Sequence, residues 1–208
     1  MSLFVHDEGI NNIIKRYPVS VSLVFINTIF LILTLILGGF KYSVLFKLGG
    51  LDVYELHGGD YYRLIMPIFL HGSVYHYLTN TFFGILILGI ALEKLIGSLR
   101  FFMVYFISGI TSSLLIYFLG YYFDLYMGLT VGASGAIYGI LGFFTFILIF
   151  NKRFFYPSER QYLIGLIVVN ALVSFMPNVS FIGHLGGFIA GFILSLINYV
   201  FKKKRYKH

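Results

Sequence analysis

The chain has 208 residues, of which 59% are hydrophobic and 11% are charged, and its mean hydropathy is +0.89. This composition excludes an ordinary soluble domain and indicates a polytopic membrane protein, because apolar runs of nearly 20 residues recur along the chain. The net charge of +7 does not indicate a nucleic-acid partner, since the basic residues lie between the apolar runs.

Six apolar runs predict an all-α membrane protein with a bundle of six transmembrane helices. The predicted spans are 19–40, 75–92, 101–122, 134–150, 162–176 and 181–201. The one long connection, 41–70, is expected to have some structure of its own. We therefore divide the chain into an N-terminal segment, 1–18, a single membrane domain, 19–201, and a basic tail, 202–208.

The distribution of basic residues predicts how these spans are oriented. Twelve of the fifteen lysines and arginines fall on the side of the two termini, and Lys41, Lys47 and Arg63 fall on the other side. Because basic residues are enriched in cytoplasmic loops, both termini are predicted to be cytoplasmic. We expect a multi-pass protein of the cell membrane, namely of a bacterial plasma membrane. Its basic tail is expected to contact anionic lipid.

In this orientation, polar residues of three spans are expected at one depth near the outer face. Ser134 begins the fourth span, His184 lies about one turn into the sixth, and His76 and Asn80 lie in the first turns of the second. An imidazole in hydrocarbon is costly and needs a reason. The shared depth therefore predicts that the three spans meet at one polar site.

Small residues predict which spans pack together. Glycines recur at intervals of four on the fourth and sixth spans, at Gly135 and Gly139 and at Gly183, Gly187 and Gly191. Such spacing lets two helix backbones approach closely. Close packing would bring the hydroxyl of Ser134 to the imidazole of His184, as a serine nucleophile and its general base require. The chain has no cysteine, which excludes a cysteine nucleophile and thiolate metal sites.

Further groups are expected to complete such a site. Tyr138 lies four residues after Ser134 on the same helix face and is expected to hold the histidine ring, because no acidic residue lies at this depth. His76 and Asn80, also four apart, and the unpaired backbone amide of Ser134 are expected to bind the oxyanion of a tetrahedral intermediate.

Other polar residues receive structural interpretations. Glu93 is expected to pair locally at the inner end of the second span, and His71 to order the outer loop. Asn170 and Ser174 of the fifth span are expected to form hydrogen bonds with other helices. That span has few small residues, and we regard it as a candidate gate for substrate.

These residues resemble the motifs of the rhomboid intramembrane serine proteases, in their basic six-helix form. The resemblance extends over all six spans, and its motifs are Gly132-Ala133-Ser134-Gly135 with Tyr138, His184 with Gly187 and Gly191, and His71, His76 and Asn80. It implies that Ser134 is the nucleophile, that His184 is the base, and that His76, Asn80 and the Ser134 amide form the oxyanion site. The family's Trp-Arg pair in the first outer loop appears here as Tyr62-Arg63.

Two other functions are weighed against a protease. A metal- or haem-binding membrane protein would use His71, His76 and His184, but the sequence has no His-Glu-x-x-His motif and no acidic ligand in the membrane. A transporter would place polar residues in mid-span and break matched helices. The sequence therefore favours a serine endopeptidase, without cofactor or metal, that cleaves single-pass membrane proteins in or near their transmembrane helix.

Overall fold

The computed structural model describes residues 3–4, 9–125, 128–177 and 179–205. This part of the chain is all-helical, with one isolated β-bridge between Leu51 and Thr130. Its elements are α1 (Ile10–Arg16), α2 (Pro18–Ile36), α3 (Tyr42–Lys47), α4 (Val53–His57), η1 (Tyr61–Leu64), η2 (Met66–Phe69), α5 (Val74–Leu78), η3 (Thr79–Gly89), α6 (Ile90–Ile96), α7 (Ser98–Tyr122), α8 (Ser134–Phe150), η4 (Lys152–Phe154), α9 (Pro157–Val173) and α10 (Phe181–Arg205). The predicted all-α class is confirmed. The segment 1–18 and the tail 202–208 lie partly outside the described residues, so their assignments stay predictions.

Four helices within the described residues are long and apolar enough to cross a membrane. They are α2, the continuous unit α5–η3–α6, α7, and α10 from Phe181 to Tyr199. Helix α8 is apolar but has 17 residues, as does α9. The prediction of membrane-spanning helices is therefore confirmed, and the count of six spans stays a prediction.

Local sequence signals explain where several helices begin. Gly97 has a φ of +84°, which glycine adopts easily, and it separates α6 from α7. Pro157 begins α9 because its fixed φ suits a first helical turn. Helix α9 thus starts five residues before the predicted span at 162 and ends at Val173 rather than at 176.

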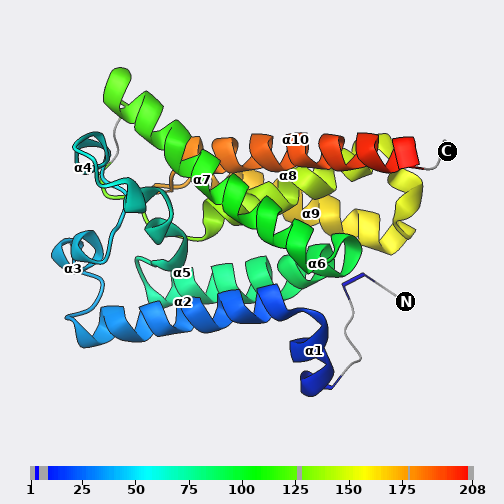
Figure 1. Cartoon of the computed structure of the whole chain (residues 1–208), viewed down its shortest axis with the longest axis horizontal. Coiled ribbons are helices and arrows are strands. Elements are labelled where there is room, and N and C mark those ends of the chain that lie inside the picture. Colours follow the sequence, from blue (N-terminus) through cyan, green and yellow to red (C-terminus); the bar gives the residue numbers. More distant parts are fainter. Residues whose placement is uncertain (1–2, 5–8, 126–127, 178, 206–208) are drawn as a thin grey trace.

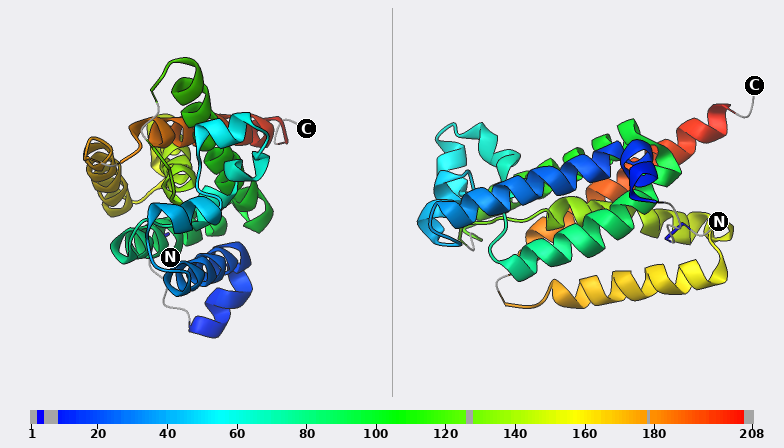
Figure 2. Two further views of the ribbon diagram at one scale, coloured as in Figure 1. Left: turned by 90° about the vertical axis from the view of Figure 1, so that its left-hand side faces the viewer. Right: turned by 90° about the horizontal axis from the view of Figure 1, so that it is seen from below.

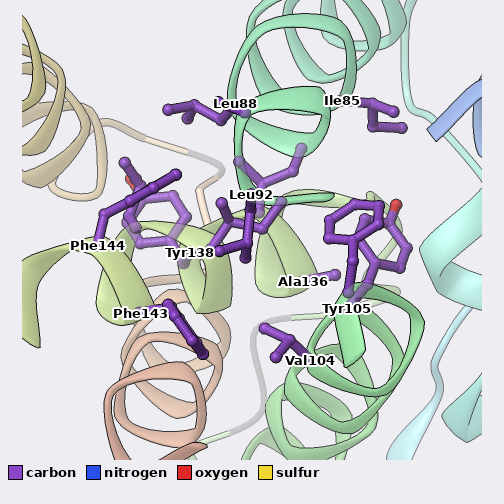
Figure 3. Close-up of a cluster of buried hydrophobic side chains, with 14 of the residues drawn as sticks. Ile85, Leu88, Leu92, Val104, Tyr105, Ala136, Tyr138, Phe143 and Phe144 are labelled. Atoms are coloured by element: carbon purple, nitrogen blue, oxygen red, sulfur yellow. The ribbon is translucent and has the colours of Figure 1, made fainter. Parts of the chain in front are cut away.

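Helix α8 lies in the middle of the bundle. Eleven of its seventeen residues are buried, so it is covered on several sides. Figure 3 shows its Tyr138, Phe143 and Phe144 among side chains of neighbouring helices, including Leu88 and Tyr105. A helix that is apolar all round is typical of such a central position.

The remaining elements surround this centre (Figures 1 and 2). Helix α1 and the end of α10 lie at one end of the bundle, and α3 and α4 lie at the other. Helix α9 runs along the outside, and among its own residues only Glu159 and Leu163 are buried. The segment just before α8 contacts the connection that holds α3 and α4, through the Leu51–Thr130 bridge and the hydrogen bond from the Gly132 amide to Pro67. Helix α8 therefore begins on the side of the bundle where α3 and α4 lie.

Glycines hold α8 and α10 in backbone contact. A Cβ atom added at Gly187 would overlap the carbonyl oxygen of Gly135, and one added at Gly191 would overlap that of Gly139. The close approach predicted from the glycine spacing is present between these helices. It fixes the position of the residues next to these glycines, because backbone atoms in contact leave little room for sliding.

Glu93 has a role that the sequence reasoning missed. Its carboxylate is 2% exposed and accepts hydrogen bonds from the backbone amides of Val19 (3.1 Å) and Ser20 (2.8 Å) and from the Ser20 hydroxyl (2.7 Å). The expectation of local pairing is therefore wrong. The start of a helix has unpaired amides and a partial positive charge, so this carboxylate caps α2 and ties it to α6.

Candidate active site

The turn before α8 positions Ser134. Gly132 has a φ of +136°, a conformation that L side chains rarely adopt, and its amide donates to the carbonyl of Pro67 (2.9 Å). A Cβ atom here would lie 2.8 Å from Nε2 of His76 and 3.5 Å from Oγ of Ser134. Glycine at this position thus allows the ring of His76 to lie beside Ser134.

Ser134 and His184 are in hydrogen-bond contact. Nε2 of His184 is 2.9 Å from Oγ of Ser134, although the two residues are 50 positions apart and come from α10 and α8. The imidazole is buried and stacks on the ring of Tyr138, with centroids 3.7 Å apart and planes 14° apart. Tyr138 therefore holds the face of the histidine ring, while the hydroxyl lies at its edge.

The other nitrogen of His184 contacts a residue that sequence reasoning did not connect to it. Nδ1 lies 2.9 Å from Oγ of Ser174, which is itself 2.7 Å from the hydroxyl of Tyr138. The Tyr138 hydroxyl in turn donates to the backbone carbonyl of Asn170. Interhelical hydrogen bonding by Ser174 was expected, but the sequence did not indicate which residue would be its partner.

The ring of His76 lies beside Gly132, which is in the turn before α8. Its Nδ1 accepts a hydrogen bond from the amide of Gly72 (3.4 Å). A neutral imidazole has one donor and one acceptor nitrogen, so we assign the proton to Nε2. This nitrogen is the one beside Gly132 and Ser134. His76 therefore presents an N–H group toward the site.

Asn80 lies one turn farther along and is buried. Its Nδ2 donates to the carbonyl of His76 (2.9 Å), so one of its two amide protons is used within its own helix. The helix here has the wider turns of a π-helix, from Thr79 to Gly89, which apolar periodicity does not signal. The hydrogen bond to His76 needs only one of the two amide protons of Asn80.

The ring of His71 packs against the ring of His76. It is 2% exposed, and its ring lies edge-on to those of His76 (centroids 5.3 Å) and Tyr77 (5.5 Å). Burial, together with the neighbouring His76, lowers the pKa of His71 to about 3. The ring is therefore neutral at physiological pH, in keeping with the structural interpretation that the sequence favoured.

Arg63 organises the connection between α2 and α5. Its guanidinium is 3% exposed and donates to the carbonyls of Phe46 (3.0 Å) and Gly50 (2.8 Å) and to Asp60 (3.1 Å). It also lies over the ring of Phe46, 4.4 Å from the centroid. Tyr62, in contrast, is exposed. Of the Tyr62-Arg63 pair, Arg63 fastens the loop internally, and Tyr62 lies on the surface.

The histidines offer little to a metal ion. Among the residues that the structure describes, no three His, Cys, Asp or Glu side chains lie close enough together to hold one. Both ring nitrogens of His184 are engaged with serine hydroxyls, at Ser134 and Ser174. The arrangement thus gives more support to a hydroxyl–imidazole pair than to a set of metal ligands.

Comparison with known proteins identifies relatives over most of the chain. The family model of the Rhomboid domain matches residues 58–201. "Putative rhomboid protease YdcA" of Bacillus subtilis (strain 168) is 32% identical over 210 residues, which are 98% of this chain and 100% of that protein. "Rhomboid protease GluP" of the same organism is 35% identical over 135 residues, 64% of this chain and 25% of that protein.

One further relative bears a different description. "Inactive rhomboid protein 1" of Danio rerio is 36% identical over 139 residues, 65% of this chain and 15% of that protein. The chain thus spans all of one relative and a small part of the other two. Similarity of this degree includes a protein named as inactive, so it does not by itself show that this chain is active.

Proposed function

Because this chain belongs to the rhomboid family, we propose that it is an intramembrane serine endopeptidase with Ser134 as nucleophile and His184 as general base. The observation that carries the proposal is the 2.9 Å contact between Oγ of Ser134 and Nε2 of His184. This contact joins two helices that glycines hold together. Nothing in the sequence next to either residue requires the two side chains to meet. A nucleophile within hydrogen-bond reach of a base, which a third group orients, is the arrangement that acyl transfer needs.

The geometry supports a two-step acyl transfer. Nε2 of His184 takes the hydroxyl proton as Oγ of Ser134 attacks the carbonyl carbon of the scissile peptide. The protonated imidazole then gives that proton to the leaving amine, and a water molecule releases the acyl group by the same steps in reverse order. His184 is held for both transfers by its stacking on Tyr138.

The oxyanion of the tetrahedral intermediate needs donors on the side of Ser134 away from the base. Nε2–H of His76 and the backbone amide of Ser134, at the start of α8, supply two such donors in our proposal. The second amide proton of Asn80 is a third candidate. Gly132 keeps these groups close, and Gly135 and Gly187 hold the two helices that carry nucleophile and base.

Substrates are proposed to be single-pass membrane proteins cut in or near their transmembrane helix. A helical peptide bond is shielded by its own hydrogen bonds, so substrates with glycine or other helix-weakening residues are expected. We further propose six spans with both termini in the cytoplasm, which opens the site to the exterior. The count of basic residues supports this orientation, as does the position of α1 and the end of α10 at the same end of the bundle.

The proposal is tested by reconstituting the purified protein in lipid vesicles with a single-pass substrate that carries glycines near the outer end of its helix. We expect a cleavage product whose new terminus maps within or beside the transmembrane segment, and whose yield does not change when EDTA is added. Loss of the product on chelation would favour the metal alternative. Absence of a product from this substrate would contradict the protease.

A further inference from the structure

We propose that Ser174 is a positioning residue for catalysis, which accepts the Nδ1 proton of His184 and so leaves Nε2 free to take the proton of Ser134. The inference rests on the proposed protease function and extends it from two residues to three. It starts from the contact of 2.9 Å between Oγ of Ser174 and Nδ1 of His184.

The contacts that lead away from His184 have a limited number of hydrogens to share. His184, Ser174, Tyr138 and the carbonyl of Asn170 form three successive short contacts. The carbonyl can only accept, so Tyr138 donates to it and Ser174 donates to Tyr138. The hydroxyl of Ser174 then has no hydrogen left for His184, and Nδ1 must be the donor in that contact.

The opposite arrangement leaves one contact without a hydrogen. If Ser174 donated to Nδ1, the hydroxyls of Ser174 and Tyr138 would lie 2.7 Å apart with no hydrogen between them while Tyr138 donates to Asn170. Two oxygens at that distance repel each other unless they share a hydrogen. The tautomer of His184 is therefore set by an acceptor at the far end of the chain.

The burial of Ser174 is a second, independent observation. Ser174 follows α9 and is 5% exposed, although its apolar neighbours Val173 and Phe175 are 38% and 74% exposed. A segment that buries its polar residue and exposes its apolar ones has a specific partner for the polar group. At the end of this otherwise external helix, the partners of the Ser174 hydroxyl are Tyr138 and His184.

An alternative reading is that Ser174 only caps its own helix. Its hydroxyl lies 3.1 Å from the carbonyl of Asn170, which is a common back-bond for serine in a helix. That bond uses the hydroxyl hydrogen and leaves both lone pairs of the oxygen. Acceptance from Nδ1 of His184 is therefore compatible with it, and the assigned tautomer is the same.

The role proposed for Ser174 corresponds to that of the acid in a serine–histidine–aspartate triad. The acid of such a triad holds the imidazole in the correct tautomer and orientation and stabilises the imidazolium. A hydroxyl carries no charge, so its contribution is expected to be smaller than that of an aspartate. The stacking of Tyr138 on the ring supplies part of the orientation that remains.

The test compares Ser174→Thr with Ser174→Val, which have nearly the same shape and differ in the hydroxyl. We expect kcat to fall roughly 10- to 100-fold in Ser174→Val with little change in KM, and to be largely restored in Ser174→Thr. Ser158→Ala, which removes an exposed hydroxyl near the start of α9, is the matched control and should behave as wild type. Thermal unfolding of each variant in detergent shows that it is folded.

Equal kcat values for the Val and Thr variants would overturn the inference, as would a change confined to KM. Ser134→Ala is measured in the same experiment. If it still cleaves, the proposed function fails, and Ser174 has no base to orient. If it is inactive while Ser174→Val is fully active, the protease stands and only the role of Ser174 is wrong.

Discussion

Ser134→Ala and His184→Ala are each expected to abolish cleavage of a single-pass substrate, by a factor on the order of 10⁴ or more. The first removes the atom that forms the acyl bond, and the second removes the imidazole whose Nε2 lies 2.9 Å from Ser134 Oγ and is placed to take its proton. Product formation in vesicles, followed on gels and by mass spectrometry, measures the effect. The double variant should be no less active than either single one, because the two residues act as a unit.

Two controls separate chemistry from folding in this experiment. Ser158→Ala makes the same chemical change at an exposed position and should retain full activity. The thermal unfolding midpoint of Ser134→Ala should match that of the wild type, because the change removes one hydroxyl at the edge of the site. A variant of Ser134 that still cleaves at the same bond would show that the nucleophile is elsewhere.

Gly191→Ala is expected to lower the free energy of unfolding by about 1–3 kcal/mol and to reduce activity strongly. Alanine would normally favour a helix over glycine by about 1 kcal/mol, so the sign of the effect reports on packing alone. The added Cβ would overlap the carbonyl oxygen of Gly139, which can yield only if α8 and α10 move apart. A displacement of about 1 Å between nucleophile and base can cost on the order of 10²-fold in rate.

Gly165→Ala is the matched control for this prediction. Gly165 lies on α9, and a Cβ atom added there meets nothing within 4 Å. The control should therefore be neutral or slightly stabilising, with unchanged cleavage. For both variants, the stability is measured by unfolding in detergent and the activity by cleavage of the substrate in vesicles. Equal stability of the two would contradict the close contact of α8 and α10.

The approach of α8 to α10 could be predicted because it depends on residue size alone. Gly135, Gly139, Gly187 and Gly191 mark helix faces on which backbones can touch, and the spacing of four is visible in the sequence. The contact of Ser134 with its histidine follows from that packing. The stacking of Tyr138 on the ring could be predicted for the same reason, since it lies one turn from Ser134.

The contacts that the sequence did not predict are those set by the path of the chain between helices. Ser174 reaches His184 through the turn that joins α9 to α10, and Glu93 reaches Ser20 across 73 residues. Arg63 contacts carbonyls of the connection between α2 and α5, whose positions depend on the fold of that connection. None of these pairings has a periodic pattern, so neither helical spacing nor hydropathy could indicate them.

Helix boundaries and helix type were predicted with different success. Helix α8 begins at Ser134 and ends at Phe150, as predicted, because Gly132 lies just before its N-cap and a charged loop follows it. Helix α9 begins earlier than its apolar stretch, since Pro157 and the capping carboxylate of Glu159 favour a start among polar residues. The π-helical turns of η3 were missed because they differ from α-helical turns in hydrogen bonding and not in composition.

Labelling with a fluorophosphonate tests the central claim most directly, because the reagent forms a covalent bond with an activated serine and needs no knowledge of the natural substrate. Mass spectrometry of the labelled wild-type protein should locate the adduct on Ser134, and the His184→Ala variant should not be labelled at a comparable rate. An adduct on another residue, or labelling of Ser134 that is unaffected by the loss of His184, would contradict the account.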